Sequence, residues 1–475
     1  MMQLQPTDYP TNVSANGARN LFNISLTAAL AGFIFGFDTV VISGANQPIK
    51  DIWHTTEISP WFHGFFIMSM ALWGTVIGAV FGGIPTQKSG RKKVLFWVGI
   101  LFSVSALGSA LAQDPYTFSF FRFIGGVGIG VSSVAAPTYI SEISTPATRG
   151  RLGALYQFNI VFGILIAFLS NYFIKSFGLG GHNDWRWMLG VMTVPSLIYT
   201  LMVIGIPESP RWLIAVKNDL TTAKKVLFRL GVANADEVIE TVRTSALHEA
   251  AAGQTSGFFS YKYKTILWLA FMVAFFNQWS GINFILYYAP EILERAGLAA
   301  KESLFNSIAI GGTNLLFTFV GLYLIDKAGR KQLLIIGSIG YIISLGVVAW
   351  SFYSNANPEF LLTFLLFFIA SHAVGQGAVI WVFISEIFPN KIRATGQSFG
   401  ASVHWVFAAL ITLITPVFLD KDHGIFKNNP WPIFAFFAFM MVLQLIWILT
   451  KVPETKGVTL EELERKLVRE KSVVK

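Results

Sequence analysis

Two ionisable residues, Asp38 and Arg122, stand inside long apolar stretches of the sequence. Charged side chains at bilayer depth are costly, so they face a cavity or find a partner. Burial disfavours a carboxylate and a neighbouring cation favours it, so moving Arg122 away from Asp38 and back would load and unload a proton. The sequence therefore predicts a proton-coupling pair. A static ion pair, or an Asp38 near the outer mouth of its helix, remains the alternative.

A second group of polar residues lies within eleven positions of another apolar stretch, around Gly281, a residue at which a helix can break. Amides both donate and accept hydrogen bonds, and aromatic rings offer a surface for stacking. Such groups suit a ligand that is a ring of hydroxyls with one apolar face. The predicted ligand-binding residues in this stretch are Asn277, Gln278, Asn283 and Tyr287. Candidates of the same kind elsewhere are Gln157, Asn314, Trp381, His404 and Trp405.

Two of these candidates have open alternatives. Asn314 suits a hydrogen bond between helices equally well, and His404 suits packing or a proton-linked role.

Membrane-spanning helices must position these groups. The chain of 475 residues is 53% hydrophobic and only 13% charged, whereas a soluble chain carries roughly 25% charged residues. This composition excludes a soluble enzyme. About twenty apolar residues suffice to cross a bilayer as a helix. Twelve such spans are predicted, at 21–44, 61–85, 94–112, 116–138, 152–174, 187–206, 265–290, 303–325, 332–352, 359–384, 395–419 and 431–451.

Basic residues alternate between the predicted loops. Lys88, Arg91, Lys92 and Lys93 follow span 2, whereas Asp114 is the one charge in the loop after span 3. Loops rich in Lys and Arg stay on the cytoplasmic side. The net charge of +9 therefore reflects topology and not nucleic-acid binding. The pattern predicts a multi-pass protein of the plasma (inner) membrane with both termini cytoplasmic.

Charged motifs repeat between the two halves. Lys88-Ser89-Gly90-Arg91-Lys92 returns at 327–331, an offset of 239 (88 to 327). Ile140-Ser141-Glu142-Ile143 returns at 384–387, and Pro207-Glu208-Ser209 returns as Pro453-Glu454-Thr455. Three motifs in one order at nearly one offset indicate a duplication. Two parallel repeats around a central site are typical of transporters that work by alternating access.

The motifs also resemble a known family. Pro137-Thr138-Tyr139-Ile140-Ser141-Glu142, 207–213, 278–283, 385–389 and 453–457 are similar to the signatures of the sugar porters, within the major facilitator superfamily. The match covers about 20–465 and is nearest in character to bacterial sugar–proton symporters and to glucose facilitators. The resemblance implies that Asp38 and Arg122 couple a proton. It also implies that the matching residues contact sugar: Gln157, Gln278, Asn283, Asn314, Trp381 and Trp405.

The expected fold is therefore all-α, the major facilitator fold, with twelve helices in two pseudo-symmetric six-helix bundles. The predicted organisation is an N-terminal cytoplasmic tail, a first bundle, a linker of short cytoplasmic helices, a second bundle and a C-terminal cytoplasmic tail, at 1–20, 21–206, 207–264, 265–451 and 452–475.

Charges at the cytoplasmic helix ends can pair across helices. The resemblance implies that they form a latch favouring the outward-open state. Setting the topology is the alternative role, and it is the favoured one for Lys92 and Lys93. The predicted gating residues are Arg91, Glu142, Arg149, Glu208, Arg211, Asp326, Arg330, Glu386, Arg393 and Glu454.

This chain departs from the family pattern at four points. Gln87 stands where an acid is usual, Asn277 where glutamine is usual, and His404 where Gln or Asn is frequent. Gly375-Gln376-Gly377-Ala378 lacks the usual proline of the tenth span. The differences at Asn277 and His404 leave the preferred sugar open, and Gln87 predicts an N-terminal latch that is weaker or differently wired.

Proton-coupled import of a monosaccharide (pentose or hexose) or polyol is the leading functional prediction. A uniporter without a proton and a non-transporting sugar sensor are the alternatives. The seven histidines are scattered and no phosphate-binding Gly-x-x-x-x-Gly-Lys-Ser/Thr loop occurs, which disfavours an enzyme or an ATP-driven pump. The predicted partners are the sugar, the proton and the lipid bilayer, without nucleic acid, cofactor or metal, and the chain is expected to act as a monomer.

Overall fold

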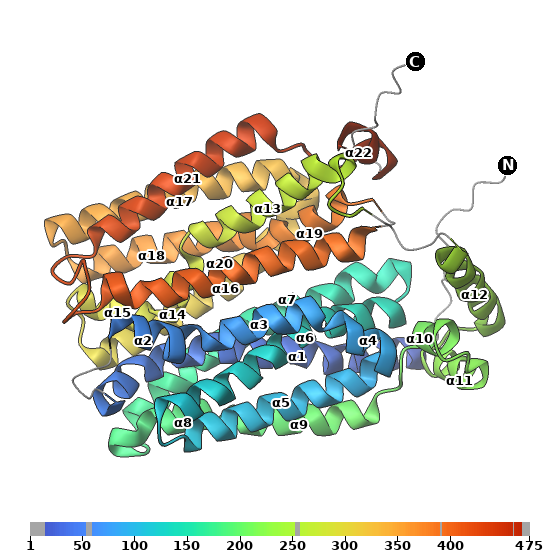
Figure 1. Ribbon diagram of the computed structural model, residues 1–475, viewed down its shortest axis with the longest axis horizontal. Coiled ribbons are helices and arrows are strands. Elements are labelled where there is room, and N and C mark those ends of the chain that lie inside the picture. Colours follow the sequence, from blue (N-terminus) through green and yellow to red (C-terminus); the bar gives the residue numbers. More distant parts are fainter. Residues whose placement is uncertain (1–14, 54–58, 252–256, 390–391, 459, 468–475) are drawn as a thin grey trace.

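The computed structural model describes residues 15–53, 59–251, 257–389, 392–458 and 460–467. Within these ranges, twelve helical segments are long and apolar enough to cross a membrane, which is the number that the sequence predicts. Figure 1 shows them running side by side along the longest axis of the molecule. Because each residue adds about 1.5 Å of helix, 20 or more residues span the hydrocarbon layer.

The N-terminal half contains the first six spans. They are α1 (Ala15–Trp53); α2, η1 and α3 (Pro60–Phe62, His63–Ser69, Met70–Phe81); α5 (Arg91–Leu111); α6 (Pro115–Ile143); α7 (Pro146–Ser176); and η2, α8 and α9 (Gly181–Asn183, Asp184–Gly190, Thr193–Gly205). The short helix α4 (Gly83–Ser89) precedes α5.

The C-terminal half contains the other six. They are η3, α13 and α14 (Tyr261–Tyr263, Lys264–Trp279, Ile282–Tyr287); α16 (Ala300–Ala328); α17 (Arg330–Ser354); α18, η4 and α19 (Pro358–His372, Ala373–Gly377, Ala378–Ile387); α20 (Arg393–Leu419); and α21 (Trp431–Lys451). The helix α15 (Ala289–Arg295) follows α14.

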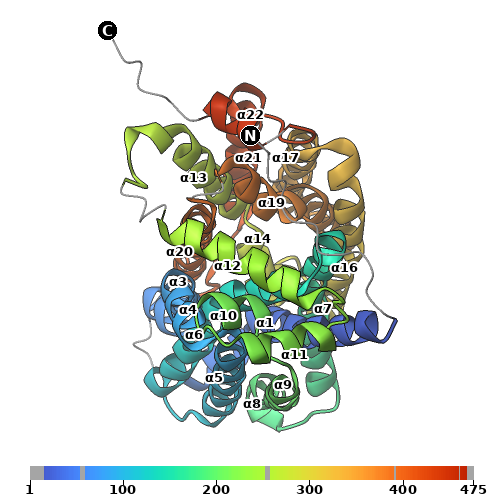
Figure 2. The same ribbon diagram turned by 90° about the vertical axis from the view of Figure 1, so that its right-hand side faces the viewer.

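Four short helices lie at one end of the molecule, which Figure 2 shows face on. Three of them, α10 (Pro210–Ala215), α11 (Leu220–Arg229) and α12 (Ala235–Ala251), connect the two halves, and α22 (Leu460–Leu467) follows the last span. We call this end the basic end, because the Gly-Arg-Lys turns before α5 and α17 lie here. The other end is called the opposite end.

Small residues allow the helices to pack closely. A Cβ on Gly126 of α6 would lie 1.8 Å from the carbonyl oxygen of Ala71 on α3, and one on Gly74 would lie 2.2 Å from that of Phe123. Only glycine fits such a helix crossing, which is typical of membrane bundles. Large apolar side chains such as Trp97, Leu201 and Leu316 are exposed on the outside, where lipid would cover them.

The first span is longer than the sequence predicts. Residues 21–44 were expected, but α1 runs from Ala15 to Trp53. The hydropathy pattern ends early because Asn46, Gln47 and Lys50 are polar. Asn46 and Lys50 form contacts with the C-terminal half, so tertiary interactions stabilise a polar helical turn that its composition does not favour.

Candidate functional site

Three amides and one histidine form a buried hydrogen-bonded cluster in the C-terminal half. Gln278 on α13 is 1% exposed. Its Nε2 donates to Asn277 Oδ1 at 3.2 Å and to the ring of His404 on α20, whose nearer nitrogen is 3.0 Å away. Its Oε1 accepts from Asn283 Nδ2 at 3.0 Å. Because an amide nitrogen can only donate, a ring nitrogen of His404 must be the acceptor in this hydrogen bond.

Aromatic rings flank this cluster. The ring of His404 lies between those of Trp381 and Trp405, with centroids 5.1 and 4.8 Å away. Trp405 in turn contacts Phe35 of α1 at 5.6 Å, which joins the two halves at this level. Phe35 was not selected from the sequence, because it is one of 44 phenylalanines and only the contact distinguishes it. The arrangement offers a polyhydroxylated ring both hydrogen bonds and apolar faces.

A break in the seventh span positions the amides. Gly281 has φ 86°, the left-handed region, and separates α13 from α14. A Cβ at this position would lie 2.8 Å from the ring of Phe437. The break turns Asn283 back toward Gln278, five residues earlier, a spacing at which an unbroken helix would not bring the side chains together.

We expect Gly281→Ala to lower the affinity for the ligand and to destabilise the fold by about 1–3 kcal/mol. A non-glycine residue in the left-handed region is strained, and the added methyl meets Phe437. Gly312→Ala is the matched control, because it lies inside α16 and its Cβ would meet no atom within 4 Å. Thermal unfolding and ligand titration of the purified variants measure both effects. Equal behaviour of the two variants would contradict this role of the break.

Asp38 and Arg122 meet in the core of the N-terminal half. They are 0% and 2% exposed. Arg122 Nη1 donates to Asp38 Oδ1 at 2.5 Å, and Nη2 donates to the backbone carbonyl of Asp38 at 3.3 Å. Asp38 Oδ2 is buried and accepts no hydrogen bond from a described residue. Arg122 thus engages one carboxylate oxygen of Asp38 and leaves the other without a donor among the described residues.

Three other predicted ligand-binding residues form no hydrogen bond with the amide cluster among the described residues. Tyr287 is 1% exposed on α14, close enough to Asp38 and Arg122 to interact with their charges. Gln157 is half-buried on α7, and Asn314 is 5% exposed on α16. Among the described residues, no hydrogen bond joins the side chain of Gln157 or Asn314 to the cluster or to another helix. Their sugar contact stays a prediction, as does the helix–helix bond considered for Asn314.

At the basic end, the N-terminal half contains a charged cluster around Glu142. Arg91 Nη2 donates to Glu142 Oε1 at 2.8 Å, and the Ser209 hydroxyl donates to Glu142 Oε2 at 2.5 Å. Glu208 accepts from the backbone N–H groups of Arg91 and Lys92 at 2.9 and 3.0 Å. These are the first N–H groups of α5, which have no partner inside the helix. The carboxylate of Glu208 therefore satisfies these donors, and its negative charge is stabilised by the N-terminal end of the helix dipole.

The C-terminal half repeats this cluster. Arg330 binds Glu386 through two nitrogens, at 2.8 and 3.1 Å, and the Thr455 hydroxyl donates to Glu386 at 2.6 Å. Glu454 accepts from the backbone N–H groups of Arg330 and Lys331 at 2.9 and 3.0 Å. Burial raises the pKa of Glu454, but these and neighbouring backbone donors outweigh it and hold that pKa below its usual value. The duplication seen in the sequence is thus a duplicated hydrogen-bond pattern, in which Ser209 and Thr455 take part.

The remaining predicted gating residues are placed unevenly. Asp326 lies 3.5 Å from Arg330, whereas the equivalent Gln87 has no charge and accepts through its backbone carbonyl from Trp212 Nε1. Arg149 is exposed and forms no ion pair with a described residue. Arg393 donates to the carbonyl of Phe388 at 3.4 Å. Arg211 is exposed at the start of α10. The ion pairs of Arg91 and Arg330 each join groups of one half.

Comparison with known proteins gives one consistent result. The family model described as "Sugar (and other) transporter" matches residues 24–467. An arabinose-proton symporter of Bacillus subtilis is 35% identical over 98% of this chain and 99% of its own length. A galactose-proton symporter of Escherichia coli is 34% identical, with 94% of each chain covered.

A solved structure leads to the same family. The xylose transporter XylE of Escherichia coli, in a partially occluded inward open conformation, has a TM-score of 0.82 and 30% identity over 93% of this chain and 100% of that chain. Its fold, the twelve spans and the family match agree with the duplicated motifs. The chain therefore belongs to the sugar porter family of the major facilitator superfamily and is a multi-pass membrane transporter, not an enzyme.

Proposed function

We propose that the protein imports a monosaccharide, either a pentose or a hexose, or a related polyol together with a proton by alternating access. One observation carries the proposal. Asp38 lies one helical turn after Phe35 on α1, and Phe35 contacts Trp405 beside the amide cluster. A change at the buried acid can thus reach the proposed sugar site through a single helix.

The proposed cycle uses the free oxygen of Asp38. Protonation at Oδ2 removes the negative charge that Arg122 neutralises, which weakens the attraction between α1 and α6. Sugar hydroxyls would replace the hydrogen bonds that Gln278, Asn283 and His404 now form with one another. Binding of both substrates then favours movement of one half against the other, and release of the proton restores the pair.

The distribution of basic residues supports the orientation. Arg91, Lys92, Arg330 and Lys331 lie at the basic end, where α1 begins and α21 ends. By the positive-inside rule we assign this end, and both termini, to the cytoplasm. The opposite end then faces outward. Asp38 and Arg122 serve as coupling residues, and the clusters of Glu142 and Glu386 serve as gating groups.

Uptake into liposomes tests the proposal. An inward gradient of about one pH unit can drive at most roughly tenfold accumulation at one proton per sugar. We expect the purified protein to accumulate a labelled sugar under that gradient. Competition by unlabelled pentoses, hexoses and polyols identifies the substrate. Simple equilibration of sugar with no response to the gradient would instead indicate a uniporter, and no uptake of any tested sugar would point to a sensor.

We expect Glu142→Lys to favour opening at the cytoplasmic end. The new ammonium would lie beside Arg91 and leave the Ser209 hydroxyl without its acceptor. The charged cluster of the N-terminal half would then lack the carboxylate that joins these two residues. A cysteine introduced near this end should react several-fold faster with a thiol reagent. The native chain contains no cysteine, so the signal comes from the introduced residue alone. Glu240→Lys on α12, whose side chain is 69% exposed, is the control with the same charge change. If both variants react like the parent, Glu142 is only a topological anchor.

A further inference from the structure

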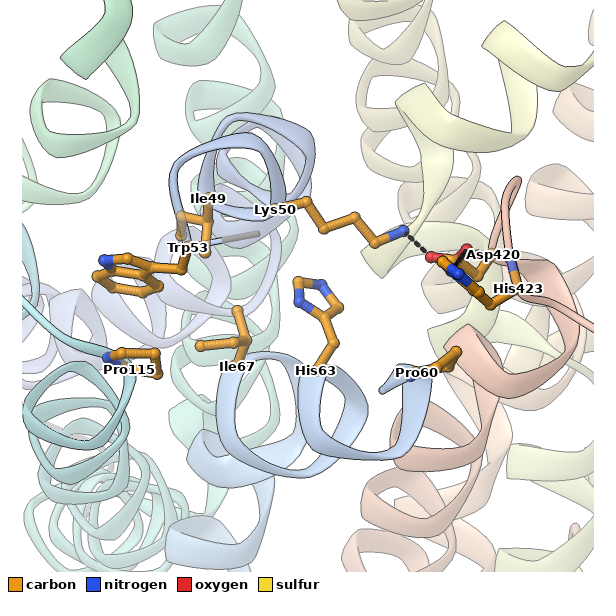
Figure 3. A pocket seen from close by; sticks show the side chains of 9 residues that line it. All are labelled: Ile49, Lys50, Trp53, Pro60, His63, Ile67, Pro115, Asp420 and His423. Carbon is orange, nitrogen blue, oxygen red and sulfur yellow. Dashed lines mark hydrogen bonds and ion pairs between the residues drawn. The ribbon is translucent and has the colours of Figure 1, made fainter. Parts of the chain in front are cut away.

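A crevice at the opposite end is lined by residues of both halves. Figure 3 shows Lys50 of α1 and His63 of η1 on one side and Asp420, the residue after α20, on the other. Lys50 Nζ lies 2.7 Å from Asp420 Oδ2 and 3.7 Å from Glu291 Oε1 of α15. Among the ion pairs whose two partners are both described residues, those of Lys50 connect the two halves, and the others do not.

These three charges are largely shielded from water. The side chains of Lys50, Glu291 and Asp420 are 12%, 13% and 10% exposed. A pair so shielded is screened less by salt than a surface pair, and loss of one partner leaves an uncompensated charge. Two carboxylates facing one ammonium make that loss more costly, since they would also repel each other.

The C-terminal half holds Asp420 in a fixed position. Its Oδ1 accepts from the backbone N–H groups of Asp422 and His423, both at 2.9 Å. Arg295 of α15 donates to the carbonyl oxygens of Leu419 and Lys427, on either side of this turn. Burial raises the pKa of Asp420, but Lys50 and the backbone donors outweigh it and hold that pKa well below its usual value. Asp420 therefore stays ionised throughout the neutral and mildly acidic range.

The N-terminal half contributes a second connection. Asn46, one turn before Lys50 on α1, donates from Nδ2 to Glu291 Oε2 at 2.8 Å, and its Oδ1 lies 2.6 Å from His63 Nε2. Because Nδ2 already faces Glu291, His63 must donate to Oδ1. The helices η1 and α20 also pack closely at this end, since a Cβ on Gly64 would lie 1.9 Å from the carbonyl oxygen of Leu413 on α20.

We propose that Lys50, Glu291 and Asp420 form a charged gate that holds the opposite end closed, and that Lys50 is the residue that sets the balance between the two open states. This gate is separate from the sugar and proton sites and from the charged clusters at the basic end. It stabilises the state in which the basic end is open, because its ion pairs connect the halves only while the opposite end is closed. A sugar can enter from this end only after these three charged side chains have separated.

Cysteine accessibility measures the gate directly. Ile67 lines the crevice from η1 and is 2% exposed. In an Ile67→Cys background, we expect Lys50→Met to raise the rate of thiol labelling roughly 10- to 100-fold, since a hydrogen bond to a charged group is lost. Lys50→Arg should keep the slow rate. Lys175→Met is the matched control, because it breaks the Lys175–Asp184 ion pair, of length 2.6 Å, inside one half.

A double-mutant cycle separates the gate from a general loss of stability. If Lys50 and Asp420 act together, Asp420→Asn raises labelling by itself, and the double variant is no faster than the faster single variant. Additive effects, unchanged labelling in Lys50→Met, or equal acceleration by Lys175→Met would each overturn the proposal. The assay needs neither sugar nor a proton gradient, so its outcome is independent of the proposed transport function.

Discussion

Liposomes that contain the Asp38→Asn variant should exchange labelled for unlabelled sugar across the membrane but should not accumulate sugar under a pH gradient. Asparagine keeps the size and hydrogen bonding of the protonated acid, and it cannot cycle a proton. Accumulation should fall from up to about tenfold per pH unit to none. Exchange should continue, because the amide cluster of the other half is unchanged.

A static ion pair makes a different prediction for this variant. The substituted asparagine would then leave the buried Arg122 uncompensated, and folding and binding would fall together. Asp184→Asn is the matched control, since Asp184 is also a buried acid of this half and pairs with Lys175 at 2.6 Å. We expect that variant to accumulate sugar normally. Accumulation by Asp38→Asn would exclude Asp38 as the coupling acid and make His404 the next candidate.

Gln278→Ala should weaken sugar binding roughly five- to a hundred-fold. Gln278 contacts three other members of the cluster, and each lost hydrogen bond in a closed site costs on the order of 1–3 kcal/mol. Titration of the purified variant with the transported sugar measures the loss. Gln278→Asn should retain part of the affinity, because the amide remains but is one methylene shorter.

Gln444→Ala is the control for that experiment. Gln444 is also a fully buried amide of the C-terminal half, and it donates to the Ser338 hydroxyl at 3.0 Å between α21 and α17. Its loss should lower thermal stability without changing sugar affinity. If the two variants change affinity equally, or if Gln278→Ala binds sugar like the parent, the amide cluster is not the sugar site.

Much of the architecture could be predicted from local properties of the chain. Hydrophobic length determines a membrane helix, because every backbone polar group must be satisfied inside the segment. The number of spans and the duplicated halves therefore follow from the sequence, and the structure agrees. The cost of burying Asp38, Arg122 and Gln278 in lipid also made them recognisable before any fold was known.

The limits of that reasoning are seen at the ends of the spans. Hydropathy ended the first span at 44, although α1 continues to Trp53. Polar residues such as Asn46, Gln47 and Lys50 interrupt the apolar pattern there, and nothing local predicts that Asn46 would bind Glu291 or that Lys50 would bind Asp420. Partners 245 positions apart, as Asn46 and Glu291 are, become neighbours only when the two halves pack together.

What the sequence determined, then, is the set of groups that cannot face lipid, because a charge or an amide buried without a partner is costly wherever it lies in the chain. Which of these groups meet was decided by the tertiary structure. It brought His404 to Gln278 and, through a break at Gly281, Asn283 to Gln278. It left Gln157 and Asn314 without a hydrogen bond to that cluster among the described residues. The tertiary structure also decided that ion pairs of Lys50 connect the halves at the opposite end. Helix packing sets these distances, and packing depends on the whole chain at once.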